Sequence, residues 1–185
     1  LYHVNDNIKI TTRGCEGIDD KLLDWGIIIV KQDGQNKVYN IEEHRWPLPD
    51  DHTLVRMVPI PGKDNMLKGY AALMKKTAKG ALYDPQSGEK LSEYLFDDVH
   101  NEIFADKYIQ VTVTGKVGLY DIETKRYVLP CEHSKVGGYN VFNGNEFVVI
   151  TKAGKQGVYN ITDSKMTIAP QNDEVDMRGG FARIR

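Results

Sequence analysis

The chain has 185 residues, with 24 Lys and Arg against 26 Asp and Glu, 41% hydrophobic residues and 2 cysteines. A chain of this length fits one domain or one compact repeat array, and it buries enough apolar surface to fold without a disulfide framework or a metal. The formal net charge of -2 argues against a basic face for nucleic acid or anionic membranes, and the longest apolar run, residues 26–30, is too short to cross a bilayer.

The first 24 residues lack the pattern that follows them. The chain starts without an initiator Met or a signal-peptide pattern, so we interpret it as a trimmed fragment or a mature chain that is soluble and either cytoplasmic or exported. Residues 9–12 predict a strand and residues 19–23 a short helical turn. We therefore expect residues 1–24 to be an N-terminal cap or the remnant of an earlier unit.

Residues 25–185 contain an internal repeat, which is the most informative feature of the sequence. Four segments align on a central Tyr, and the Tyr-to-Tyr steps are 44, 37 and 39 residues. A small residue lies five positions before each Tyr, and a Val lies sixteen positions after it. The aligned residues are Tyr39, Tyr83, Tyr120 and Tyr159, followed by Val55, Val99, Val136 and Val175.

Each unit predicts three short strands. Residues 108–113 alternate in hydropathy, and a tight turn at Gly115 then leads into a second strand at residues 118–121. Residues 126–129 form the third strand, which we expect Pro130 to end because proline has no N–H for a central ladder.

Two further stretches complete the predicted architecture. Residues 136–142 indicate a fourth strand, and residues 181–185 resemble the opening strand of a fifth unit cut short. The sequence therefore predicts an all-β fold of about four consecutive antiparallel β-meanders, each about 37–44 residues long. Three clear strands per unit favour an open array over closure into a β-propeller.

The turn and the strand after it share a motif, Gly-Lys-x-Gly-Leu-Tyr-Asp at residues 115–121, and residues 155–160 match it closely. Leu129-Pro130, His133 and Val136 follow at fixed distances. This pattern resembles the WG-repeat family of mainly bacterial proteins, although Val117 and Gln156 stand where the family has its name-giving Trp. The resemblance covers roughly residues 25–185 and implies a β-rich scaffold of uncharacterised role, with no catalytic residues to carry over.

No motif predicts a cofactor or a metal. Residues 115–118 and 154–157 superficially resemble phosphate loops, but they lack the following Ser or Thr and the helix, so we interpret them as hairpin turns. Cys131 and His133 are two positions apart, and no second pair completes a zinc site. Of the five histidines, His52 and His133 share one repeat position, and we expect half-buried rings there. The others are His3, His44 and His100.

No catalytic constellation is visible either. Neighbouring residues of a strand point to opposite faces, so we expect the acidic pairs to be solvated turns rather than acid-base dyads. Neither cysteine lies in a nucleophile motif, and Ser134 beside His133 lacks a nucleophile elbow. The sequence thus predicts a protein that is not an enzyme. The acidic pairs are Asp19-Asp20, Asp50-Asp51 and Asp97-Asp98, and the cysteines are Cys15 and Cys131.

The recurrent tyrosines predict an aromatic ladder through the core, with stacking on sugars or bases as the less favoured alternative. Binding residues stay unassigned. The insertion at residues 57–65 is rich in Pro and Gly, and we expect its tip to be a flexible contact surface. The stretch Trp46–Pro49 is a candidate contact, with a core position for Trp46 as the equal alternative.

These observations favour a non-enzymatic repeat scaffold that binds another protein through its loops. The alternatives are a carbohydrate- or cell-surface-binding module, a glycosidase-like enzyme on a β-repeat scaffold, and a passive spacer beside an active domain. We expect no nucleic acid and no membrane insertion among its interactions, and a glycan is the second partner class.

Overall fold

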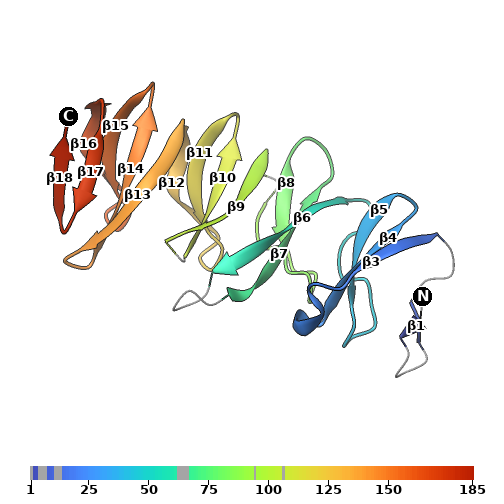
Figure 1. Cartoon of the computed structure of the whole chain (residues 1–185). Coiled ribbons are helices and arrows are strands. Elements are labelled where there is room, and N and C mark those ends of the chain that lie inside the picture. The colour runs from blue at the N-terminus through green and yellow to red at the C-terminus, as the bar shows by residue number, and fades with distance from the viewer. Residues whose placement is uncertain (1, 4–7, 11–13, 62–66, 94, 106) are drawn as a thin grey trace. The chain divides into compact units, whose positions relative to one another are not determined.

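The protein is all-β, as the repeat pattern predicts. The computed structural model describes residues 2–3, 8–10, 14–61, 67–93, 95–105 and 107–185 (Figure 1). These residues form antiparallel β-strands and one short 3-10 helix, η1 at Leu23–Trp25, and they contain no α-helix. The chain divides into two compact units, residues 1–59 with 69–95 and residues 60–68 with 96–185.

The first unit contains two meanders of three strands, in the orders β3-β4-β5 and β6-β7-β8, and the pair β1-β2 precedes them. In each meander an isolated bridge stands where a fourth strand would lie, between Asn40 and Arg45 and between Tyr83 and Lys90. The strands are β1 (Tyr2–His3), β2 (Ile8–Lys9), β3 (Cys15–Asp19), β4 (Ile27–Gln32), β5 (Gln35–Asn40), β6 (Thr53–Pro61), β7 (Leu67–Lys75) and β8 (Gly80–Tyr83).

The residues before position 25 contribute β3 to the first meander, because β3 pairs with β4. Whether residues 1–24 form a separate cap stays a prediction. The expected helical turn at residues 19–23 lies slightly later, as η1. The strand expected at residues 9–12 is β2, which ends at Lys9, while residues 11 and 12 lie outside the described residues.

The second unit contains two four-stranded meanders and a final hairpin, in the orders β12-β11-β10-β9, β13-β14-β15-β16 and β17-β18 (Figure 1). The strand predicted at residues 136–142 is β13, but it opens the next sheet instead of closing its own. The strand expected at residues 181–185 is β18. The strands are β9 (Asp98–Phe104), β10 (Tyr108–Val113), β11 (Lys116–Asp121), β12 (Arg126–His133), β13 (Lys135–Phe142), β14 (Asn145–Lys152), β15 (Lys155–Asn160), β16 (Lys165–Asn172), β17 (Val175–Arg178) and β18 (Phe181–Ile184).

The motif turns are hairpins, as expected. Thr114 and Gly115 have φ of 49° and 70°, and Ala153 and Gly154 have φ of 52° and 78°. Positive φ at both central residues is the type I′ geometry, whose twist matches that of the flanking strands. Neither Gly-Lys segment is followed by a helix, so the structure contradicts a phosphate loop at these turns.

Pro130 does not end the third strand, contrary to our prediction, because β12 continues to His133. Val117 pairs with His133 and Leu119 with Leu129, so three residues of β12 lie opposite Gly118 alone. Since β12 is an edge strand with a bulge here, it tolerates a proline.

The bulge explains the glycine that stands two positions before Tyr120 and Tyr159 in the second unit. A Cβ on Gly118 would lie 2.5 Å from the Leu129 carbonyl oxygen, and one on Gly157 would lie 2.4 Å from that of Ile168. Both contacts are with backbone atoms, which cannot move aside as a side chain can. The glycine is therefore required by the close approach of the neighbouring strand.

Three of the four recurrent tyrosines are buried, and Tyr159 is half-buried. Tyr39 packs edge-on against Trp46 with centroids 5.1 Å apart, and Tyr120 packs against Phe96 at 5.2 Å. Tyr39, Tyr83 and Tyr120 are thus core residues with edge-on aromatic neighbours, and Tyr159 packs against the core of the second unit.

Candidate functional site

Among the described residues, two surface features are candidate binding sites. One is a hollow in the first unit, and the other is an apolar groove in the second unit.

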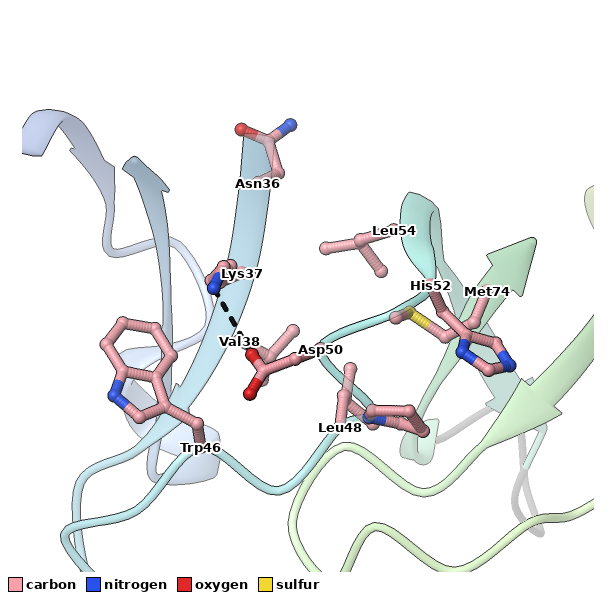
Figure 2. A pocket seen from close by; sticks show the side chains of 10 residues that line it. Asn36, Lys37, Val38, Trp46, Leu48, Asp50, His52, Leu54 and Met74 are labelled. Carbon is pink, nitrogen blue, oxygen red and sulfur yellow. Dashed lines mark hydrogen bonds and ion pairs between the residues drawn. The ribbon is translucent and has the colours of Figure 1, made fainter. Parts of the chain in front are cut away.

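The hollow lies beside the candidate contact stretch Trp46–Pro49. Figure 2 shows Trp46 on one side of it, His52 and Met74 on the other, and an ion pair between Lys37 Nζ and an Asp50 carboxylate oxygen, 3.2 Å apart. Its volume is about 20 Å³, which accommodates a water molecule but is far below the roughly 300–1,000 Å³ of ordinary ligand pockets.

Trp46 itself is half-buried and packs against Tyr39. The structure places Trp46 against the core, at the edge of the hollow, while its role as a contact for a partner stays a prediction. A side chain packed in this way is held in place by its core contacts, so its ring is not free to reorient and stack on a ligand.

Asp51 connects a lysine and a histidine at the rim of the hollow. Its carboxylate accepts a hydrogen bond from Lys76 Nζ at 2.7 Å, and its other oxygen lies 2.6 Å from His52 Nδ1. The hydrogen bond from Lys76, and then that from His52, lowers the pKa of Asp51. The His52 side chain is buried and packs edge-on against Tyr83, which confirms the expected ring at this repeat position.

The acidic pairs do not converge on one pocket. Asp19 and Asp50 are exposed and pair with lysines. Asp97 differs from the expectation of a solvated turn, because it is half-buried and accepts a hydrogen bond from the Thr114 backbone N–H, which fixes the β10–β11 turn. Three carboxyl groups of the described residues have a clearly shifted pKa, and in each the pKa is lowered. They are Glu16, Asp51 and Glu146. Such groups are anions at neutral pH and suit charge pairing rather than proton donation.

The cysteines and His133 make no metal centre. Cys15 is exposed and Cys131 is half-buried, and both are free thiols. Among the described residues no group of three or more His, Cys, Asp or Glu side chains is placed to hold a metal ion. His133 is buried, its Nδ1 has no hydrogen-bond partner, and burial lowers its pKa. It has the same repeat position as His52, and the nearby Glu132 carboxylate only partly offsets the effect of burial on its pKa.

The second unit holds a cluster of hydrogen-bonded polar side chains around one carboxylate, that of Glu146, which the sequence pattern did not indicate. Glu146 accepts hydrogen bonds from the hydroxyls of Tyr108 and Tyr139 and from Lys107 Nζ, the last two at 3.2 Å. Burial is the main reason that the pKa of Tyr108 is raised to about 12, and the hydrogen bond with Glu146 is the second. The cluster joins β10 to the β13–β14 hairpin and leaves the carboxylate few free lone pairs, so it is suited to holding the two sheets together.

The apolar groove lies between the β13–β16 sheet and the β17–β18 hairpin, with a volume of about 140 Å³. Phe181 at its rim is 81% exposed, and Phe142 is 41% exposed. The repeat pattern did not indicate this groove, although it predicts a strand at residues 181–185. The lining residues are Asn140, Phe142, Phe147, Val158, Thr167, Ile168, Met177, Gly180, Phe181 and Ala182.

The predicted contact loop at residues 57–65 is only partly described. Residues 57–61 belong to strand β6 and are not a loop, with Val58 buried and Met57 packed against the core. Their pattern of apolar residues extends the strand in spite of two prolines. Residues 62–65, at the tip, lie outside the described residues.

Comparisons with known proteins add little to this geometry. No family model matches the chain, and no curated protein matches it. Among solved structures it is similar to "Dihydro-heme d1 dehydrogenase NirN in complex with DHE", at 13% identity and a TM-score of 0.36. The match covers 77% of this chain and 35% of that one. In the part of the chain that the structure describes, no helix is long and apolar enough to cross a membrane.

Proposed function

We propose that this chain is a non-enzymatic repeat scaffold that binds another protein through an apolar face of its second unit. One observation carries the proposal. Two large aromatic side chains that line the apolar groove, Phe142 of β13 and Phe181 of β18, are 41 and 81% exposed.

A face of this kind is typical of a protein contact. Exposed large apolar side chains that gather in one region mark interaction sites more often than single ones do. Aromatic residues and Met are also enriched at the centres of protein interfaces. Phe181, Phe142 and Met166 supply these residue types, while the nearby Arg178 and Arg183 supply a charged rim.

The resemblance of the repeat motif to WG repeats supports a scaffold role, and we infer that the chain is a degenerate member of that family. The close approach at Gly118 and Gly157 gives a physical reason for the motif glycine. Repeated meanders keep a constant core while their exposed residues vary, which is how repeat proteins obtain binding surfaces.

The test is a pull-down from a lysate of the source cell, with this chain as bait and mass spectrometry as the readout. We expect one protein to be enriched near one-to-one and its capture to fall at least five-fold with Phe181→Ser. Ile18→Ser in β3 is the matched control, because Ile18 is 48% exposed but lies in the first unit. An empty pull-down, or equal loss with both variants, refutes the proposal and favours a glycan screen or the spacer alternative.

A further inference from the structure

The β13–β14 hairpin ends in an Asn-Gly turn at Asn143 and Gly144. Their φ values are 49° and 76°, and Phe142 pairs with Asn145 directly before and after them. Positive φ at both residues of a two-residue loop is the type I′ geometry. Asn143 and Gly144 are both exposed, so the turn lies at the surface of the second unit.

The described part of the chain does not shield the side-chain amide of Asn143. That amide forms no hydrogen bond there, while the backbone oxygen of Asn143 accepts one from Asn145 Nδ2 at 3.3 Å. The Gly144 N–H has no backbone partner among the described residues, and a Cβ on Gly144 would meet nothing within 4 Å. Both groups are therefore open to solvent, and glycine places no side chain in the way of a ring closure between them.

Three other hairpin turns of the chain show that the turn does not need the asparagine. Their first residues have φ of 50°, 49° and 52°, and each is followed by a glycine with positive φ. These residues are Asp33, Thr114 and Ala153. Since Asp, Thr and Ala all take the conformation of Asn143, an amide at this place adds reactivity and not turn stability.

We propose that Asn143 is a site of spontaneous deamidation, with water as the co-reactant. The Gly144 nitrogen loses its proton to solvent and attacks Asn143 Cγ. The N–Cγ bond forms, the Cγ–Nδ2 bond breaks, and Nδ2 leaves as ammonia with a proton from water. One water molecule then opens the five-membered imide. Opening at Cγ gives aspartate, whereas opening at the backbone carbonyl carbon gives isoaspartate, whose main chain runs through Cγ.

Ring closure requires the hairpin to open at its tip, because the imide holds the backbone of Asn143 in a conformation that a type I′ turn does not have. The tip is the part of a hairpin that opens most easily, since its exposed backbone hydrogen bonds have no further pair beyond them. We therefore expect the reaction in the folded chain to be slower than in a free peptide of the same sequence.

The two products differ in their effect on the hairpin. Aspartate fits the turn, as Asp33 shows at the equivalent place of another hairpin. Isoaspartate lengthens the main chain by one atom, and the register of a hairpin depends on the length of its turn. The pairing of Phe142 with Asn145 is then lost.

Loss of this pair displaces the Phe142 side chain, which lines the apolar groove. Its ring lies close to the next hairpin, because a Cβ on Gly180 would be 2.3 Å from Phe142 Cδ2. Isoaspartate at position 143 is thus expected to weaken the proposed protein-binding face. This consequence rests on the proposed function, whereas the reaction at Asn143 does not.

The test is ageing of the complete 185-residue chain in mildly alkaline buffer, followed by peptide mapping with mass spectrometry. We expect Asn143 to be converted at least ten-fold faster than any other asparagine of the described residues. Labelling by an isoaspartyl methyltransferase identifies the isoaspartate in the same peptide. Isomerisation of Asp33 leaves the mass unchanged, so it does not contribute to the measured conversion.

Asn143→Thr is the matched control, because Thr114 has the same place and φ in the β10–β11 turn. It is expected to lower the conversion of this peptide at least ten-fold. After ageing, hydrogen exchange of residues 139–148 should be at least five-fold faster in the isoaspartyl wild type, and unchanged in aged Asn143→Thr and in fresh Asn143→Asp. Conversion of Asn143 no faster than that of other asparagines, or equal conversion in Asn143→Thr, overturns the inference. Conversion without faster exchange overturns the effect on the hairpin.

The two proposals fail separately. If Asn143 stays intact, deamidation is refuted and Phe181→Ser still tests the protein-binding face. If the aged wild type captures a partner as well as aged Asn143→Thr although its hairpin has opened, the deamidation site stands and the proposed face beside Phe142 is wrong.

Discussion

Replacing Tyr120 by alanine tests the core position of the recurrent tyrosines. Tyr120 is 2% exposed and packs edge-on against Phe96 and Tyr127, with centroids 5.2 and 5.5 Å apart. Removing a buried aromatic side chain costs about 3–5 kcal/mol, and each edge-on ring pair contributes about 0.5–1.5 kcal/mol of specific interaction. We expect Tyr120→Ala to lower the free energy of unfolding of the second unit by about 4 kcal/mol.

The assay has to report on the second unit alone. Both tryptophans, Trp25 and Trp46, belong to the first unit, so tryptophan fluorescence does not follow the unit that contains Tyr120. Hydrogen exchange of β10–β12 peptides, measured by mass spectrometry in increasing urea, gives the local free energy directly. Tyr120→Phe is the matched control, because it keeps the ring and both edge-on contacts.

A loss below about 1 kcal/mol for Tyr120→Ala, or an equal loss for Tyr120→Phe, would refute the reasoning. The first result would mean that the ring does not hold the second unit together. The second would assign the stability to the hydroxyl rather than to the packed ring.

Three further predictions concern the second unit. Gly118→Ala places a Cβ 2.5 Å from a backbone oxygen and is expected to cost about 3 kcal/mol, whereas Gly137→Ala, which meets nothing within 4 Å, is expected to be neutral in the same urea titration. Burial lowers the pKa of His133 below its value in the unfolded chain, so the unfolded state binds the proton first and stability falls as pH drops below about 6.5, towards the folded pKa. His133→Phe should flatten that fall in pH-dependent melts. Glu146→Gln removes the charge that accepts hydrogen bonds from two tyrosine hydroxyls and a lysine, and is expected to cost about 1–3 kcal/mol at pH 7. Because the pKa of Glu146 is lowered in the folded state, this cost should shrink as pH falls below the unfolded carboxyl pKa, about 4.3, towards the folded one. A cost that does not change with pH would contradict a role of the charge.

The repeat and the hairpins could be predicted because their signals are local. A two-residue turn with Gly and a strand with alternating hydropathy depend on neighbouring residues only. The glycine turns at Gly115 and Gly154 and the burial of Tyr39 and Tyr120 were therefore predictable. The repeat pattern did not indicate the apolar groove, since it describes the core and not the surface.

Predictions were wrong where the outcome depends on how one strand pairs or packs with another. Pro130 lies within β12 because a bulge at a sheet edge accommodates it, which no local rule indicates. Val55 has the same repeat offset as Val136 but is 43% exposed, while its neighbour Leu54 is buried. A shift of one residue moves a side chain to the opposite face of a strand, so an offset along the chain does not fix which residue faces the core.

The sequence by itself determined the all-β class, the period of the meanders and the hairpin turns, because these follow from turn chemistry and alternation. The tertiary structure alone decided how the sheets end and pack. It placed Glu146 against two tyrosines from other strands, and it formed the apolar groove between the β13–β16 sheet and the β17–β18 hairpin. Contacts of this kind join residues far apart in the chain, and their formation depends on sheet pairing and burial rather than on any local pattern.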